Sequence, residues 1–223
     1  MNVPQTPLKK GDQARYFSIL DNKGSTIELS LPLQKRYWLI FYRYAGCPLC
    51  NRHIYDVYRN YETLQYYNIN VIAFFTSSEQ KFPHEIAKTN SVPFPLIPDP
   101  NREIYSLYEV EPKLVGLLHP RTTLGFVKAV TAGFSQPLPD GDFFQVPGHF
   151  LINQDGTLFD AYYGNHFDDH ISWQRIKEFM SLGTPVKPPL PKQEKAAEGL
   201  VASTDYSREN MAQIVANHAN SPA

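Results

Sequence analysis

A short apolar run that passes directly into a helical pattern constrains the fold of this chain more than any other feature. Residues 38–43 read WLIFYR, and the run ends at Gly46 and Pro48. An uninterrupted run of this length predicts a strand that is buried on both faces. From Pro48 to about Tyr66, apolar residues recur every three or four positions, which predicts an amphipathic helix. Together they predict the first strand and helix of an α/β unit.

The later patterns extend this unit to a complete α/β fold. They predict, in chain order, a buried strand at 69–75, a short extended piece and a helix within 93–110, a hairpin with strands at 148–152 and 157–164, and a last helix at 172–181. Parallel strands with crossover helices, followed by an antiparallel hairpin, predict an α/β/α sandwich with a mixed central sheet.

Two further segments decorate the predicted sandwich. Residues 11–30 predict a small N-terminal hairpin that turns at Asn22–Gly24. Residues 111–146 are long for a connection and partly helical by pattern. An insertion of this kind before the late hairpin often covers a site.

Composition and charge narrow the classes of function. The 223 residues carry 21 Lys and Arg against 22 Asp and Glu, and no basic run stands out, which disfavours a nucleic-acid partner. We find no apolar stretch that predicts a signal peptide or a membrane span, so we expect a cytoplasmic protein without membrane contact. Residues 1–183 are expected to form the folded domain, and the Pro-rich residues 184–223 a linker and tail.

Both cysteines of the chain, Cys47 and Cys50, lie at the predicted junction of strand and helix. Cys47 would cap the helix, with Pro48 in the first turn, where free N–H groups and the helix dipole lower the pKa of a thiol. Cys50, one turn further on, would be close enough to attack an oxidised Cys47. Arg43 and Arg52 are expected to add positive charge. The pattern predicts a redox-active dithiol in which Cys47 attacks and Cys50 resolves.

Two other interpretations of the cysteine pair stay open. The thiols could be structural, because a CxxC motif alone is a weak signal. The pair and His53 also have the C-x2-C-x2-H spacing of part of a metal site, which His149, or His166 with His170, would have to complete. A structural zinc site needs four ligands and no second cysteine pair exists, so we expect no metal. A dithiol carries its own electrons, so we expect no organic cofactor.

Pro147 stands directly before a predicted buried strand late in the chain, in the segment QVPGHFLI. In the company of a CxxC motif, a proline at this position predicts a cis peptide bond. Such a bond would expose the backbone of Val146 to a substrate. We therefore expect Val146 and Pro147 to line the site.

These residues together resemble the thioredoxin-like superfamily and, within it, the alkyl hydroperoxide reductase/thiol-specific antioxidant group. The opening GDQARYFSILDNKGSTIELS is similar to the start of peroxiredoxins, and GHFLINQDGTLFDAYYG resembles their late hairpin. The closest resemblance is to the peroxiredoxin-like branch of selenoprotein U relatives, carried by Arg43, Gly46, Cys47, Cys50 and Arg52 in RYAGCPLCNR. The resemblance implies a thioredoxin-like fold over about residues 11–182 and redox chemistry at the two cysteines.

The chain departs from true peroxiredoxins at the positions that orient the peroxide. Their P-x-x-x-T/S-x-x-C motif would place Thr or Ser at Tyr44 and Pro at Ile40, and their late Arg is replaced by the segment 146–148. The loss of preorganised donors of this kind costs orders of magnitude in rate. The CxxC motif and the predicted cis-proline instead resemble a thioredoxin-type disulfide reductase.

The predicted function is a thiol-dependent antioxidant oxidoreductase that reduces peroxides or protein disulfides. An external thiol reductant, such as a thioredoxin-type system, would reopen the Cys47–Cys50 disulfide. Exposed members of the tyrosine-rich segments would suit a homodimer face. The alternatives are a non-enzymatic redox-sensing or interaction module and a CxxC–His metal-binding module.

Overall fold

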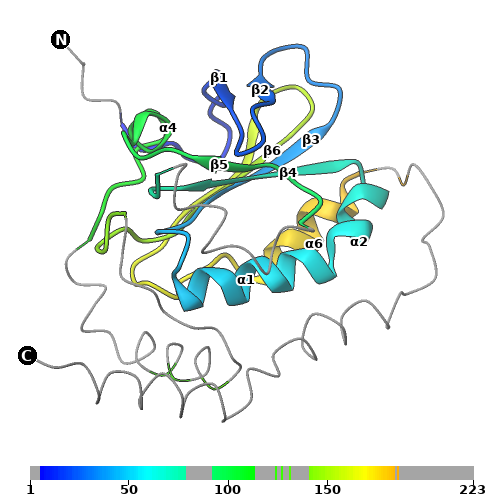
Figure 1. Cartoon of the computed structure of the whole chain (residues 1–223). Helices are drawn as coiled ribbons and strands as arrows, with labels where there is room; N and C mark the ends of the chain where they lie inside the picture. Colours follow the sequence, from blue (N-terminus) through cyan, green and yellow to red (C-terminus); the bar gives the residue numbers. More distant parts are fainter. Residues whose placement is uncertain are drawn as a thin grey trace, which may run out of the picture. The chain divides into compact units, whose positions relative to one another are not determined.

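Five strands form one mixed sheet that carries the candidate site. The protein is represented by a computed structural model, which describes residues 6–78, 92–113 and 141–183 and the single positions 124, 127, 131 and 185. The strands are β3 (Arg36–Phe41), β4 (Ile69–Phe75), β5 (Leu96–Pro98), β6 (Gly148–Ile152) and β7 (Leu158–Tyr163), and Figure 1 shows the sheet from its side. Their order in the sheet is β5-β4-β3-β6-β7. β3, β4 and β5 pair in parallel, whereas β6 and β7 pair antiparallel with their neighbours, which confirms the predicted mixed sheet.

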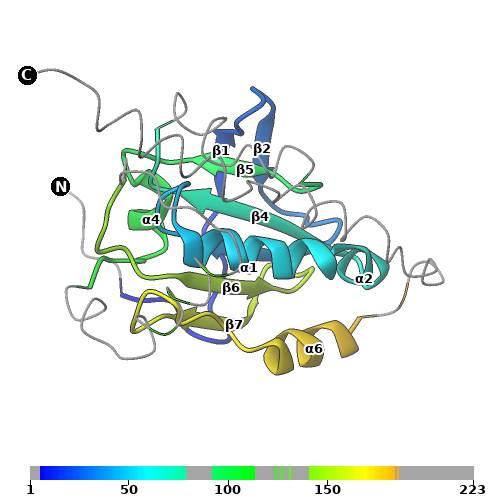
Figure 2. The ribbon, with the colours of Figure 1, turned by 60° about the horizontal axis from the view of Figure 1, so that its bottom comes forward.

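The two faces of the sheet are covered by different elements. One face packs against α1 (Pro48–Arg59), α2 (Tyr61–Tyr66) and α6 (Trp173–Ser181), which lie together below the sheet in Figure 1. The other face packs against the hairpin of β1 (Phe17–Leu20) and β2 (Thr26–Leu29) and against α4 (Glu103–Leu107), which lie above the sheet in Figure 1. Figure 2 turns the first face forward, with α1 in front of the sheet. The antiparallel pairing of β1 with β2 confirms the predicted N-terminal hairpin.

Alternation along β3 divides the core between these faces. Trp38 and Ile40 are buried on the side of α1, whereas Leu39 and Phe41 are buried on the side of the hairpin and α4. Successive side chains of a strand point to opposite faces, so a central strand must be apolar at every position. This requirement explains the continuous run from which the strand was predicted. It also places the end of β3 in the middle of the sheet, next to the start of α1.

The helix predicted from Pro48 to about Tyr66 is interrupted once. α1 ends at Arg59 and α2 begins at Tyr61, because Asn60 has φ −104° and ψ 3°. The side-chain amide of Asn60 donates a hydrogen bond of 2.8 Å to the carbonyl oxygen of Asp56. Short polar side chains that bond to the backbone in this way compete with the helical pattern.

Several predictions fall wholly or partly outside the described residues. Most of the insertion predicted at 111–146 lies outside them, and so does almost all of the tail predicted from residue 184. The boundary at 183/184 therefore stays a prediction. Among the described residues, no helix is both long enough and apolar enough to cross a membrane.

Candidate functional site

The two cysteines lie where the sequence predicts, at the start of α1. Cys47 is the residue before the helix, with the extended angles φ −67° and ψ 119°, and Pro48 is in the first turn. Gly46 belongs to the turn that precedes it, closed by a 3.1 Å hydrogen bond from the N–H of Cys47 to the carbonyl of Tyr44. Proline suits the first helical position because its missing N–H would have no partner there. The first-turn N–H groups are therefore free to face the sulfur of Cys47.

The environment of Cys47 stabilises its thiolate. The residue is buried with 0% of its surface exposed, and burial alone raises the pKa of a thiol. This effect is outweighed by a hydrogen bond from Cys50, by the charge of Arg43, and by the backbone N–H groups of Cys50 and Leu49. The result is a pKa of Cys47 of about 6. A thiolate is thus the main form of Cys47 at neutral pH.

Cys50 has the opposite character. It is buried with 1% of its surface exposed, and both cysteines are free thiols. Burial, followed by its interactions with Cys47, raises the pKa of Cys50 well above the usual value. Cys50 therefore keeps its proton and donates it in a hydrogen bond to the Cys47 sulfur. The pair combines a nucleophilic thiolate with a neighbouring neutral thiol.

Arg43 is the cation in contact with the Cys47 sulfur. Its Nη1 lies 3.3 Å from Sγ of Cys47, and its Nη2 donates a 2.6 Å hydrogen bond to the carbonyl of Phe143. The guanidinium carbon lies 3.8 Å from the ring centroid of Phe167 and 5.0 Å from that of Phe143. Aromatic faces attract a desolvated guanidinium, so the rings hold Arg43 in place. Arg43 therefore contacts the sulfur, and its supporting role in the chemistry stays a prediction.

Arg52 has a different partner from the one predicted. Its Nη2 lies 2.7 Å and 2.9 Å from the two carboxylate oxygens of Asp168, and its charge is not among the causes that lower the pKa of Cys47. Arg52 stands on the second turn of α1 and points away from the helix start, toward the segment before α6. Of the two arginines, only Arg43 contacts Cys47.

The predicted cis-proline is wrong. The Val146–Pro147 peptide bond is trans, and the single cis bond among the described residues joins Leu31 to Pro32. A trans bond is the usual state of X–Pro. Here the carbonyl groups of Val146 and Pro147 also accept hydrogen bonds within the protein. The carbonyl of Val146 accepts a 2.8 Å hydrogen bond from Gln145, and that of Pro147 accepts one of 2.8 Å from Gly164. Val146 nevertheless belongs to the same buried apolar cluster as both cysteines.

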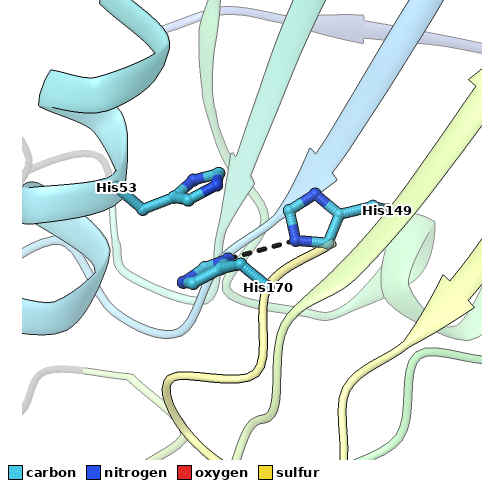
Figure 3. A group of neighbouring side chains, drawn as sticks. All are labelled: His53, His149 and His170. Atoms are coloured by element: carbon cyan, nitrogen blue, oxygen red, sulfur yellow. Dashed lines mark hydrogen bonds between the residues drawn. The ribbon is translucent and has the colours of Figure 1, made fainter. Parts of the chain in front are cut away.

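Three histidines gather between α1, β6 and the segment before α6, as Figure 3 shows. They are His53 on α1, His149 on β6 and His170 on the segment before α6, and one ring nitrogen of each lies within 4.8 Å of the others. In the part of the chain that the structure describes, this is the one group of three potential metal ligands, and neither cysteine belongs to it. The C-x2-C-x2-H combination weighed from the sequence is therefore not brought together. The sequence offers the three histidines but no spacing that would join them.

The pH dependence of Cys47 follows from its surroundings. Since the folded pKa lies below the usual thiol value of about 8.5, the thiolate is present at neutral pH and is lost as the pH falls through about 6. The rate of alkylation of Cys47 by iodoacetamide, followed by mass spectrometry, should rise with a midpoint near pH 6. In urea-unfolded protein the midpoint should move to the usual thiol range. A midpoint in that usual range for the folded protein would contradict this assignment.

Comparison with known proteins relates the chain to thiol-dependent oxidoreductases. A model of the family described as AhpC/TSA matches residues 10–161. A Mycobacterium tuberculosis protein provisionally named a peroxiredoxin is 22% identical over 169 residues, which cover 75% of this chain and 92% of that protein.

Solved structures show the same fold. Peroxidoxin BcpB of Mycobacterium tuberculosis has a TM-score of 0.54 at 16% identity, over 78% of this chain and 95% of that one. AhpC of Mycobacterium bovis has a TM-score of 0.56 at 14% identity, over 80% and 94%. A Chlorobium tepidum protein provisionally named the thiol:disulfide interchange protein DsbE has a TM-score of 0.52 at 19% identity, over 78% and 99%. The predicted thioredoxin-like fold is confirmed.

Proposed function

This chain belongs to the AhpC/TSA family, and from that premise we propose that it is a thiol peroxidase in which Cys47 attacks the peroxide and Cys50 resolves the product. The observation that carries the proposal is the contact of 3.3 Å between Arg43 Nη1 and the Cys47 sulfur. A buried guanidinium at this distance stabilises the thiolate and can donate to a peroxide oxygen at the same time. Arg43 would thus take the place of the arginine that peroxiredoxins carry before the late strand.

The proposed reaction balances with the groups present. The Cys47 thiolate attacks one peroxide oxygen, the O–O bond breaks, and the departing oxygen takes up a proton from solvent to leave as water or an alcohol. Cys47 is then a sulfenic acid. The sulfur of Cys50 attacks that of Cys47, and the Cys50 proton leaves with the hydroxyl group as water. An external dithiol, for which we propose a thioredoxin-type protein, reduces the resulting disulfide.

Burial favours a small peroxide over a protein disulfide as the substrate. Neither cysteine residue is more than 1% exposed, so a protein substrate would require a large opening of the site. The trans Val146–Pro147 bond also removes one of the two features from which a thioredoxin-type site was predicted, the other being the CxxC motif. Hydrogen peroxide needs much less space around the sulfur.

Disulfide reduction is the second candidate function. It is favoured by the side chains at the peroxide-orienting positions, because Tyr44 and Ile40 stand where peroxiredoxins have Thr or Ser and Pro. Tyr44 is fully buried and Ile40 lies within β3. Neither offers the small hydroxyl donor of the peroxiredoxin motif.

A comparison of rates separates the two candidates. Reduced protein is mixed in stopped flow with hydrogen peroxide or with oxidised glutathione, and intrinsic fluorescence is followed. We expect a second-order rate constant for peroxide at least about 10²-fold above that for the disulfide, the size of effect that one preorganised donor gives. Mass spectrometry of the peroxide product should show one Cys47–Cys50 disulfide. A faster reaction with glutathione disulfide would assign disulfide reduction instead.

A further inference from the structure

We propose that His53, His149 and His170 form a binding site for one divalent transition-metal ion, of which Zn²⁺ is the test case. This site is separate from the thiol pair and does not depend on the peroxidase proposal. Imidazole nitrogen is a preferred ligand of Zn²⁺, and three histidines leave a fourth position for water.

Three separate elements bring the rings together. His53 lies one turn after Cys50 on the buried side of α1, and His149 points from β6 toward that helix. His170 comes from the segment that leads into α6 (Figure 3). One nitrogen of each lies within 4.8 Å of the others, whereas two nitrogens on a tetrahedral zinc ion are about 3.4 Å apart. The nitrogens must therefore approach one another by about 1 Å, in addition to the rotation of one ring.

Burial keeps the rings in the form that metals require. It is the largest cause that lowers the pKa of each of the three histidines, so all are neutral at physiological pH. Nδ1 of His53 lies 2.7 Å from the hydroxyl of Tyr42, which can accept its proton. That arrangement leaves Nε2 of His53 with a lone pair for an ion, and histidine ligands in proteins commonly donate their second N–H in this manner.

His170 has one buried ring nitrogen without a hydrogen-bond partner among the described residues. The indole N–H of Trp38 donates to Nδ1 of His149 at 3.2 Å, so a neutral His149 carries its proton on Nε2. This proton is directed at Nδ1 of His170, 3.1 Å away, which places the proton of His170 on its own Nε2. Nε2 of His170 is buried and has no hydrogen-bond partner among the described residues. Native proteins rarely leave such a group unpaired. Because this nitrogen carries the proton, His170 would bind an ion through Nδ1, which must first give up its hydrogen bond from His149.

Two local changes accompany metal binding. The rings of His53 and His170 are stacked at 3.8 Å with planes 8° apart, so one must turn before both lone pairs can face one ion. His170 is the ring that turns, because it is the least buried of the three and lies outside regular structure. His149 must also move its proton from Nε2 to Nδ1, and it then loses its hydrogen bond with Trp38. The indole therefore competes with the ion.

Metal binding to the whole reduced protein tests this site. The protein is stripped with a chelator, equilibrated with Zn²⁺ against a chromophoric competitor, and analysed for metal content. We expect about one Zn²⁺ per chain, and the loss of a ligand in His170→Gln should weaken binding more than about tenfold. His166→Gln is the matched control, a buried histidine of the same segment that is outside the group, and it should bind as the wild type does.

Two further variants make the test specific. The double variant Cys47→Ser, Cys50→Ser should still bind one Zn²⁺, and loss of the ion there would assign it to the thiols and overturn the proposal. Trp38→Phe removes the competing indole N–H and should tighten binding several-fold. The same Zn²⁺ affinity in the wild type and in His170→Gln would also overturn the proposed three-histidine site.

Discussion

Replacing Cys50 by serine should leave the first oxidation of the protein intact and stop its efficient turnover. The serine hydroxyl can still donate to the Cys47 sulfur, so the thiolate survives and the reaction with peroxide should stay within a few-fold of the wild-type rate. Resolution then falls to an external thiol. Because a neighbouring group in the same molecule reacts at a very high effective concentration, turnover at millimolar reductant should drop by at least about 10²-fold.

A sulfenic acid trap provides the readout. After one equivalent of hydrogen peroxide, Cys50→Ser should carry a dimedone adduct on Cys47, whereas the wild type should carry a disulfide and no adduct. Excess peroxide should drive the variant on to the sulfinic acid. Cys47→Ser is the paired control and should react with neither peroxide nor trap. Wild-type turnover in Cys50→Ser would show that Cys50 is not the resolving thiol.

Replacing Arg43 by methionine should slow the reaction with hydrogen peroxide by about 10²-fold at pH 7, the usual effect of removing one preorganised donor. Methionine keeps much of the volume between Phe143 and Phe167 but removes the charge. The pKa of Cys47 should then rise from about 6 toward the usual thiol range. A higher pKa lowers the thiolate fraction but makes the remaining thiolate more nucleophilic, and these effects largely cancel. Most of the decrease must therefore come from the lost contact with the peroxide.

Two other variants separate charge from geometry. Arg43→Lys keeps the charge but cannot contact both the sulfur and the Phe143 carbonyl, so it should keep a low pKa of Cys47 and recover only part of the rate. Arg52→Met removes the second predicted arginine, which is paired with Asp168, and should react as the wild type does. The rates come from stopped flow and the pKa values from alkylation. An Arg52→Met variant as slow as Arg43→Met would contradict the assignment.

The strands, helices and cysteine positions could be predicted because each depends on a short stretch of sequence. A continuous apolar run such as 69–75 predicts a buried strand wherever it stands in the chain. A proline shortly after such a strand marks the helix start. The Asn60 break was missed because apolar periodicity continues across it. The break depends on one side chain that bonds to its own helix, which a pattern of apolar residues does not register.

The site beyond the cysteines depends on contacts that the sequence does not record. Arg43 and Arg52 stand four and five positions from Cys47 along the chain, but only Arg43 contacts its sulfur, because the helix turns Arg52 toward Asp168. The Val146–Pro147 bond is trans, and the Pro147 carbonyl accepts a hydrogen bond from Gly164. No local pattern contains this distant partner.

The order of the strands also has a consequence for synthesis and folding. β3 pairs on one side with β4, which follows within the same α/β unit, and on the other side with β6, where Ile40 faces His149 more than a hundred positions later. Closing so long a loop is entropically costly and slow. A chain emerging from the ribosome thus presents β3, α1 and both thiols well before β6 and its flanking segment can cover them. We expect the cysteines of the nascent chain to be open to oxidants until the second half of the sheet has formed.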